Sequence, residues 1–241
     1  MSLKLYFHPL ASFCWKVLIA LYENDTPFEP HIVDLGDERS STEFKKIWPI
    51  GKFPVLHDEA RNVTVPESSI IIEYLSHHYP GGTELVPKDP DLALQARRWD
   101  RVYDFYVHEP MQKIVGDRLR PPGKTYAPGV EQAKALLKIA YKMVDGEMAA
   151  KTWAIGDKFT MADCAAAPAL FDANKVLPFI ERYGNVARYL DRLLARPSFA
   201  RTVKGAEPYF HMFPQTGELR WPMSTVLWFR CPRRRFRPTA G

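Results

Sequence analysis

The chain has 241 residues, of which 46% are hydrophobic and 25% are charged, as in an ordinary globular protein. This length suits one large domain or two medium ones, and no apolar run approaches the roughly 18 residues of a membrane span. The formal net charge of +5 lies in residues 217–241, which hold six arginines and one acidic residue, while the rest of the chain carries 27 basic and 27 acidic side chains. This balance excludes a strongly basic body and argues against nucleic-acid binding.

The start of the chain and its cysteines indicate the cellular compartment in which the protein is expected. Residues 1–6 lead directly into a strand-like pattern and do not resemble a secretory signal. The three cysteines, Cys14, Cys164 and Cys231, are an odd number at wide spacings, which argues against a disulfide framework or a zinc site. We therefore expect a cytoplasmic protein with reduced thiols and no bound metal.

The first 80 residues alternate between strand and helix patterns, with Ser12 as the expected N-cap of the first helix. The patterns predict, in order, a strand at 3–8, a helix at 13–24, a strand at 28–33, a short helix at 42–47, two strands at 53–56 and 63–65, and a helix that begins near 67. The last two strands are close enough to form an antiparallel hairpin. A β-α-β crossover followed by a hairpin predicts a thioredoxin-like α/β domain with a mixed four-stranded sheet.

Residues 80–90 contain three prolines and two glycines and indicate a domain boundary. Thr160 and Asp163 beyond it have the spacing of a capping box, which predicts the start of a largely apolar helix. We expect a second, all-α domain, with helices at 91–116 (kinked at Pro110), 129–151, 162–174, 176–183, 186–195 and 198–206. The predicted division is 1–80, a linker at 81–90, 91–216, and a basic, irregular tail at 217–241.

The stretch 51–75 carries the features of a binding site for a small peptide with charged ends. Pro54 lies between strand-forming residues, where a proline belongs at an edge or a special backbone turn. A cis bond there would turn the N–H and C=O groups of Val55 towards a bound peptide. The start of the next helix offers free N–H groups for a carboxylate, together with the acceptor Glu67 and the hydroxyl of Ser68. Both side chains could instead serve only to cap the helix.

Four segments at these separations are similar to those of one family: residues 51–56, the junction 66–68, the linker, and the capping segment 156–163. On these segments the chain resembles a cytosolic glutathione S-transferase over residues 3–210, of the theta- or zeta-like or bacterial serine/cysteine type. The resemblance implies a homodimer without a metal. It also implies that glutathione is the co-substrate and that its thiolate attacks a small hydrophobic electrophile.

The resemblance also implies roles for residues of the binding stretch. Pro54 corresponds to the family's cis-proline and Val55 to the residue whose backbone pairs with the cysteinyl part of glutathione. Glu67 and Ser68 correspond to the residues that bind the γ-glutamyl end. The full set of glutathione-binding residues expected in this way is Lys52, Phe53, Pro54, Val55, Glu67 and Ser68. Lys52, the expected contact of the glycyl carboxylate, could equally be a solvated loop charge.

The catalytic group matches the family less closely. Members stabilise the glutathione thiolate with a hydroxyl, or replace it with a cysteine, at the start of the first helix. The expected serine falls at Ala11, so Ser12 is the favoured donor, Cys14 the alternative, and Tyr6 a weaker candidate. This departure leaves two alternatives to a transferase: a non-catalytic glutathione-fold binding protein, and a Cys14-dependent thiol–disulfide or deglutathionylation enzyme.

The second substrate would lie against the first helix of the helical domain. Tyr103, Tyr106 and Pro110 are the candidates for this hydrophobic pocket, although an aromatic stripe at helical spacing is more often part of a core. His108 has no nearby cysteine or second histidine and is expected to make a polar contact instead of binding a metal. The tail at 217–241 could lie on an anionic membrane or bind an acidic partner, but its three prolines favour an irregular extension.

Overall fold

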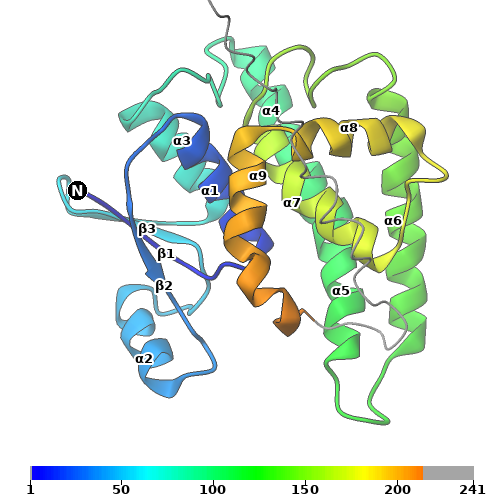
Figure 1. The fold of residues 1–241 in the computed structure, drawn as a ribbon, viewed down its shortest axis with the longest axis horizontal. Coiled ribbons are helices and arrows are strands. Elements are labelled where there is room, and N and C mark those ends of the chain that lie inside the picture. Colours follow the sequence, from blue (N-terminus) through cyan, green and yellow to red (C-terminus); the bar gives the residue numbers. More distant parts are fainter. Residues whose placement is uncertain (1, 214–241) are drawn as a thin grey trace, which may run out of the picture.

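The computed structural model describes residues 2–213, and the tail at 217–241 therefore lies outside the described residues. Its sheet has the strand order β2-β1-β3-β4 (Figure 1). The central strand β1 pairs in parallel with β2 and antiparallel with β3, and β3 forms an antiparallel hairpin with β4. The strands are β1 (Leu3–Phe7), β2 (Glu29–Ile32), β3 (Val55–Asp58) and β4 (Val63–Pro66). The predicted mixed sheet is confirmed.

Three helices cover the two faces of this sheet. α1 (Ser12–Glu23) and α3 (Ser68–His78) pack together, and α1 is flanked by helices of the second half of the chain (Figure 1). The alternation along β1 buries Leu3, Leu5 and Phe7 in the core that contains α1. Tyr6 points to the opposite face, where its ring packs against Phe44 of α2 (Glu38–Ile47). Tyr6 therefore lies on the face of the sheet away from α1.

Two helix starts differ from the sequence-based prediction. The N-cap of α1 is Ala11, and its side chain makes no capping bond, so the prediction that Ser12 caps this helix is wrong. The reason is that the Ser12 hydroxyl donates to Asp172, a partner 160 residues away. α2 begins at Glu38 and not at 42, because the carboxylate of Asp37 accepts the N–H of Ser40 at 2.7 Å and caps the earlier start.

The second half of the described chain is helical throughout. Its elements are α4 (Pro90–Val102), the π-helix η1 (Tyr103–His108), α5 (Glu109–Arg118), α6 (Ala127–Glu147), α7 (Met161–Val176), α8 (Gly184–Leu194), α9 (Pro197–Ala206) and the 3-10 helix η2 (Glu207–Met212). The helix predicted at 91–116 is thus interrupted just before Pro110, which has no N–H for the α-helical ladder. The predicted helix at 176–183 is wrong, because Leu177 precedes Pro178 and is disfavoured from helical geometry.

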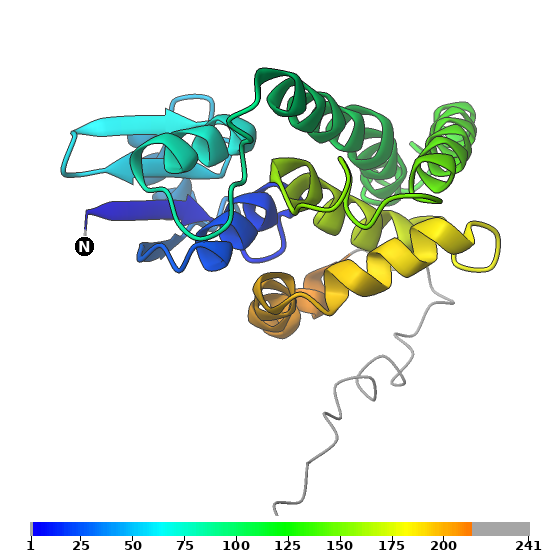
Figure 2. The same ribbon diagram turned by 90° about the horizontal axis from the view of Figure 1, so that it is seen from above.

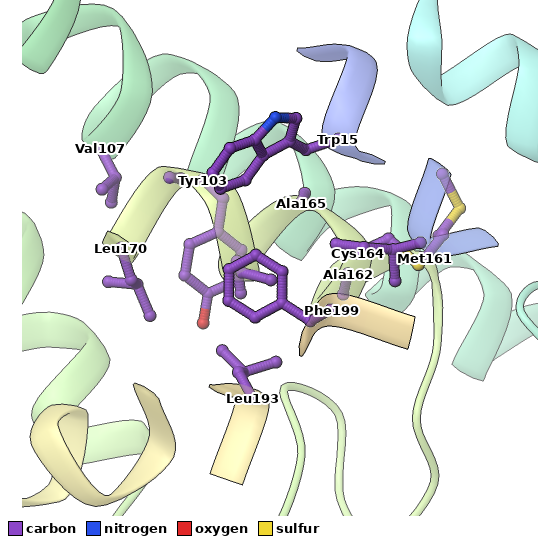
Figure 3. Close-up of a cluster of buried hydrophobic side chains, with 14 of the residues drawn as sticks. Trp15, Tyr103, Val107, Met161, Ala162, Cys164, Ala165, Leu170, Leu193 and Phe199 are labelled. Atoms are coloured by element: carbon purple, nitrogen blue, oxygen red, sulfur yellow. The ribbon is translucent and has the colours of Figure 1, made fainter. Parts of the chain in front are cut away.

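Helix α7 lies in the middle of the helical domain, between α4 and η1 on one side and α8 on the other (Figure 2). The predicted capping box is present, and Asp163 Oδ2 accepts the backbone N–H of Thr160 at 2.8 Å. Figure 3 shows Trp15 of α1 beside Tyr103 of η1 and Phe199 of α9, so one apolar cluster joins both domains. None of the helices within residues 2–213 has the length and hydropathy needed to cross a membrane.

Candidate functional site

The junction between β4 and α3 has an unusual backbone. Glu67, the N-cap of α3, has φ 69° and ψ 115°, and its side chain is exposed. A positive φ is uncommon for a residue with a Cβ and costs about 1–3 kcal/mol, so the surrounding structure must hold it in place. Ser68 follows as the first, buried residue of α3, where the N–H groups of the first turn lack intrahelical acceptors. This junction offers donors, a carboxylate and a hydroxyl together.

The loop before β3 lies beside this junction. The Phe53–Pro54 peptide bond is cis, as predicted, and Val55 pairs with Pro66, the residue just before Glu67. The hairpin register therefore brings the start of β3 to the start of α3. The structure thus places the predicted glutathione-binding residues from 53 to 55 next to Glu67 and Ser68. Lys52 is exposed in the same loop.

A cluster of buried charges lies behind α3. The side chain of Lys16 is 1% exposed, and its Nζ lies 2.8 Å from a carboxylate oxygen of Asp100 and 2.8 Å from one of Asp104. Lys16 Nζ also donates to Ser69 Oγ at 3.0 Å, and Ser69 Oγ donates to Asp100 at 2.7 Å. Arg101 pairs with both carboxylates at 2.6 Å. The cluster, which we call the Lys16 cluster, ties α1 and α3 to the helical domain.

The electrostatics of the Lys16 cluster follow from its burial. Desolvation raises the pKa of Asp104, and the positive charge of Lys16 opposes this rise. The pKa of Arg101 is raised overall. Burial alone would lower it, but the hydrogen bond to Asp100 and the negative charges of Asp100, Asp104 and Glu67 outweigh that effect. Arg101 therefore links the cluster electrostatically to Glu67 at the start of α3.

At the start of α1, the Ser12 hydroxyl donates to Asp172 Oδ2 of α7 at 2.6 Å, and both side chains are buried. The other oxygen of Asp172 lies 3.4 Å from Lys175 Nζ. Lys175 Nζ in turn lies 3.7 Å from the centroid of the Phe171 ring. The hydroxyl hydrogen of Ser12 is thus directed at a carboxylate in this structure, and its action on a thiolate stays a prediction.

Cys14 does not occupy a position suited to its predicted alternative role. Its side chain is fully buried in the core formed by the sheet, α1 and the helical domain. Burial raises the pKa of its thiol far above the ordinary value, which outweighs the lowering effect of its hydrogen bond with the His8 backbone. The structure therefore contradicts the prediction that Cys14 is an available nucleophile, because neither a disulfide substrate nor solvent reaches it.

The predicted pocket residues lie in different environments. Tyr103 is 0% exposed and lies in the apolar cluster of Figure 3, so the prediction that it lines a substrate pocket is wrong. Its spacing with Trp99 reflects packing, since the two rings are 5.8 Å apart. Pro110 is also buried, which argues against its predicted place in the pocket wall, whereas Tyr106 is 49% exposed and stays a candidate.

His108 of η1 contacts the N-terminal domain instead of a metal. Its ring lies edge-on to that of Phe13, with the centroids 4.3 Å apart. Burial, followed by the charge of Lys16, lowers the pKa of His108 to about 3, so the ring is neutral at physiological pH. No cluster of three metal-binding side chains occurs within residues 2–213. His108 is therefore more deeply buried than expected, and its observed contact is with an aromatic ring instead of the expected polar group.

His8, the last residue of the predicted first strand, makes contacts that its place in the sequence does not indicate. Its Nδ1 accepts the backbone N–H of Leu10 at 3.2 Å. Its ring stacks on Phe53, with the centroids 6.0 Å apart, and lies edge-on to Tyr209 of η2 at 5.7 Å. The contact with Tyr209 joins residues some 200 positions apart, so no local pattern in the sequence indicates it.

Comparisons with known proteins agree with this geometry. Family models described as the N-terminal and C-terminal domains of glutathione S-transferase match residues 5–83 and 102–197. A probable maleylacetoacetate isomerase of Caenorhabditis elegans is 28% identical over 200 residues, which are 81% of this chain and 90% of that protein. Glutathione S-transferase F13 of Arabidopsis thaliana is 27% identical, with coverage of 85% and 96%.

Solved structures show the same similarity. A glutathione S-transferase of Methylobacterium radiotolerans in complex with glutathione sulfonate is 30% identical, with a TM-score of 0.74 and coverage of 84% of this chain and 95% of that one. A glutathione S-transferase of Methylobacillus flagellatus with bound glutathione is 25% identical, with a TM-score of 0.77 and coverage of 83% and 98%.

Proposed function

Because the chain belongs to the glutathione S-transferase family, we propose that it binds glutathione and transfers its thiolate to a small hydrophobic electrophile. The observation that carries this proposal is the junction at Glu67. Glu67 has a positive φ and an exposed carboxylate, and it directly precedes the first turn of α3, beside the loop with the cis peptide bond. Strained backbone of this kind is maintained where a binding function needs it.

Each part of this junction suits one part of glutathione. The carboxylate of Glu67 complements the α-amino group of the γ-glutamyl residue, and the Ser68 hydroxyl with the first N–H groups of α3 complements its α-carboxylate. The backbone of Val55 would pair with the cysteinyl part. Lys52 and Phe53 would then lie towards the glycyl end, where Lys52 supplies a positive charge for the second carboxylate.

The thiolate would lie at the start of α1. Ser12 and the following N–H groups form the first turn of this helix, and the dipole there favours a negative charge. Ser12 can donate to the thiolate only if its hydroxyl leaves Asp172, so one charge-assisted hydrogen bond replaces another. Such bonds contribute about 1.5–3 kcal/mol each, and their exchange leaves a small net gain. We therefore assign most of the stabilisation to the backbone N–H groups.

This assignment predicts a modest effect of Ser12→Ala on the bound thiol. Its pKa should rise by less than about one unit, because one unit corresponds to about 1.4 kcal/mol of differential stabilisation. The ultraviolet absorbance of the thiolate, followed against pH with saturating glutathione, measures this pKa. Cys14→Ala serves as the matched control in the same helix turn and should leave it unchanged. A rise of two units or more in Ser12→Ala would instead make the hydroxyl the principal donor.

Two measurements on the wild type test the proposed function as a whole. Retention on immobilised glutathione tests the binding step, and conjugation of glutathione with a benzyl or aryl halide tests the transfer. Binding and turnover together support a transferase. Binding without turnover of any electrophile would favour the non-catalytic binding protein, for which the departure at Ala11 is the motivating observation.

We also propose that the protein acts as a homodimer. Large apolar side chains are exposed on β4, α3, α4 and η1, namely Val63, Ile70, Leu94 and Phe105. α3 and α4 are held together by the Arg97–Glu73 ion pair at 2.8 Å, so these side chains project from adjoining elements. An apolar surface of this kind is typical of an interface between subunits. Size-exclusion chromatography with light scattering should give twice the monomer mass.

A further inference from the structure

The ring of His8 is held in a fixed orientation at the entrance to α1. A backbone N–H can only donate, so the bond from Leu10 requires Nδ1 to be an unprotonated acceptor. The neutral ring must then carry its hydrogen on Nε2. Desolvation lowers the pKa of His8, and the charge of Asp34 opposes this only in part, so the neutral tautomer prevails at physiological pH. The structure therefore determines which nitrogen of His8 is the donor.

The position of this donor is equally defined. One face of the His8 ring stacks on Phe53 of the glutathione loop, at an interplanar angle of 21°, and the ring meets the C-terminal helix η2 through Tyr209. The carbonyl of His8 accepts the N–H of Ala11, the N-cap of α1, at 3.0 Å. The ring thus lies between Phe53 of the predicted glutathione site and the last described helix, and the backbone of His8 is bonded to the N-cap of α1, the helix at whose start the thiolate is proposed to lie.

Within the described part of the chain, the Nε2–H group of His8 has no acceptor. Among residues 2–213, no hydrogen bond involves Nε2 of His8. Because Nε2 is also absent from the buried polar atoms that lack a partner, it is exposed and can reach a ligand. Three other side chains of this region are bonded or buried in the structure. The Ser12 hydroxyl donates to Asp172, the thiol of Cys14 is buried, and the ring of His108 is buried against Phe13.

We propose that His8 is a specificity-determining residue whose Nε2–H donates a hydrogen bond to the carbonyl oxygen of a conjugated carbonyl electrophile. This inference rests on the proposed glutathione transfer. The thiolate sulfur forms a bond to the β-carbon, the C=C electron pair moves towards the carbonyl, and the oxygen becomes an enolate. A fixed donor at an oxygen that gains charge stabilises the transition state more than the substrate.

The proton balance of this reaction does not involve ionisation of His8. The thiol of glutathione loses its proton to solvent before the attack, and the enolate takes a proton from solvent at the α-carbon after it. His8 remains neutral throughout and contributes only the hydrogen bond. A displacement at a benzyl halide differs, because the negative charge leaves with the halide and no oxygen becomes charged. His8 should therefore matter for the first class of electrophile and not for the second.

The test compares wild type, His8→Phe and His8→Gln with an enone and with benzyl chloride, in the full chain. His8→Phe keeps an aromatic ring between Phe53 and Tyr209 but has no donor. Its kcat/KM for the enone should fall about 100-fold, the lower limit for loss of one oxyanion donor, while that for benzyl chloride should change less than about threefold. His8→Gln retains an N–H near the same place and should recover part of the enone activity.

The outcomes separate this inference from the proposed function. An equal fall for both electrophiles, or no fall for either, would overturn the role of His8 while leaving the transferase intact. A wild type that turns over neither electrophile would overturn the proposed function itself. The affinity for glutathione, measured in wild type and His8→Phe, should not change, because His8→Phe keeps an aromatic ring against Phe53.

Discussion

Replacing Glu67 with alanine is expected to weaken glutathione binding about 10- to 100-fold. The carboxylate is the acceptor proposed for the α-amino group, and hydrogen bonds to charged groups contribute about 1.5–3 kcal/mol, where 1.4 kcal/mol is a factor of ten in Kd. Titration calorimetry of wild type and Glu67→Ala measures this change. Glu43→Ala removes an exposed carboxylate that forms an ion pair with Lys46 on α2 and is the matched control. An unchanged affinity in Glu67→Ala would remove Glu67 from the site.

A second substitution at the same position separates binding from backbone strain. Glycine tolerates a positive φ, so Glu67→Gly should be about 1 kcal/mol more stable to unfolding than Glu67→Ala, which keeps the strain at φ 69°. Both variants lack the carboxylate and should lose the same affinity. If Glu67→Gly bound glutathione as tightly as wild type, the helix N-terminus alone would hold the γ-glutamyl end.

The parts of the fold that sequence predicts well are those with a local cause. The Thr160–Asp163 capping box is a short-range pair, and both of its bonds are present. The hairpin of β3 and β4 follows from two apolar runs joined by a short polar turn, and the cis bond at Pro54 lies in a recognisable run. For the same reason, the sequence indicates that residues 53–55 and the start of α3 lie close together, while their contacts with glutathione stay a prediction.

The parts that sequence predicts poorly depend on partners that are distant along the chain. Ser12 has the chemistry of an N-cap, but its hydroxyl bonds to Asp172 in another domain. Tyr103 and Tyr106 have the same residue type, yet the π-turn of η1 buries the first in the core and exposes the second. His8 contacts Tyr209 of η2, and only the docking of the two domains brings these two residues together. Tertiary packing decided each of these cases.

The Lys16 cluster gives the prediction with the largest expected effect on stability. Lys16→Met keeps most of the side-chain volume but leaves Asp100 and Asp104 buried without their common cation. Breaking a buried ion pair in this way costs about 3–5 kcal/mol, and we expect the lower end because Arg101 still contacts both carboxylates. Urea unfolding measures the loss. Lys46→Met, which breaks the exposed ion pair with Glu43, is the control and should cost less than about 1 kcal/mol.

The pH dependence of this loss tests its electrostatic origin. Burial already raises the pKa of Asp104 and Lys16 opposes the rise, so removing Lys16 should raise this pKa further. A carboxyl whose pKa is higher in the folded state than in the unfolded state binds its proton more tightly when folded. Its contribution to stability is complete below the unfolded value and is lost as pH rises through the folded value. The cost of Lys16→Met should therefore be smaller near pH 5 than near pH 7, since the ordinary pKa of Asp is about 3.9.

Asp104→Asn in the Lys16→Met background removes the charge that titrates. Much of the lost stability should return, and the difference between the two pH values should shrink, because an amide fills the same space without an ionised form. A loss that is equal at both pH values and unaffected by Asp104→Asn would point to packing of the Lys16 side chain as the cause. In that case α1 and the helical domain would be held together mainly by the apolar cluster around Trp15 and Tyr103, and the buried charges would contribute little to the docking of the two domains.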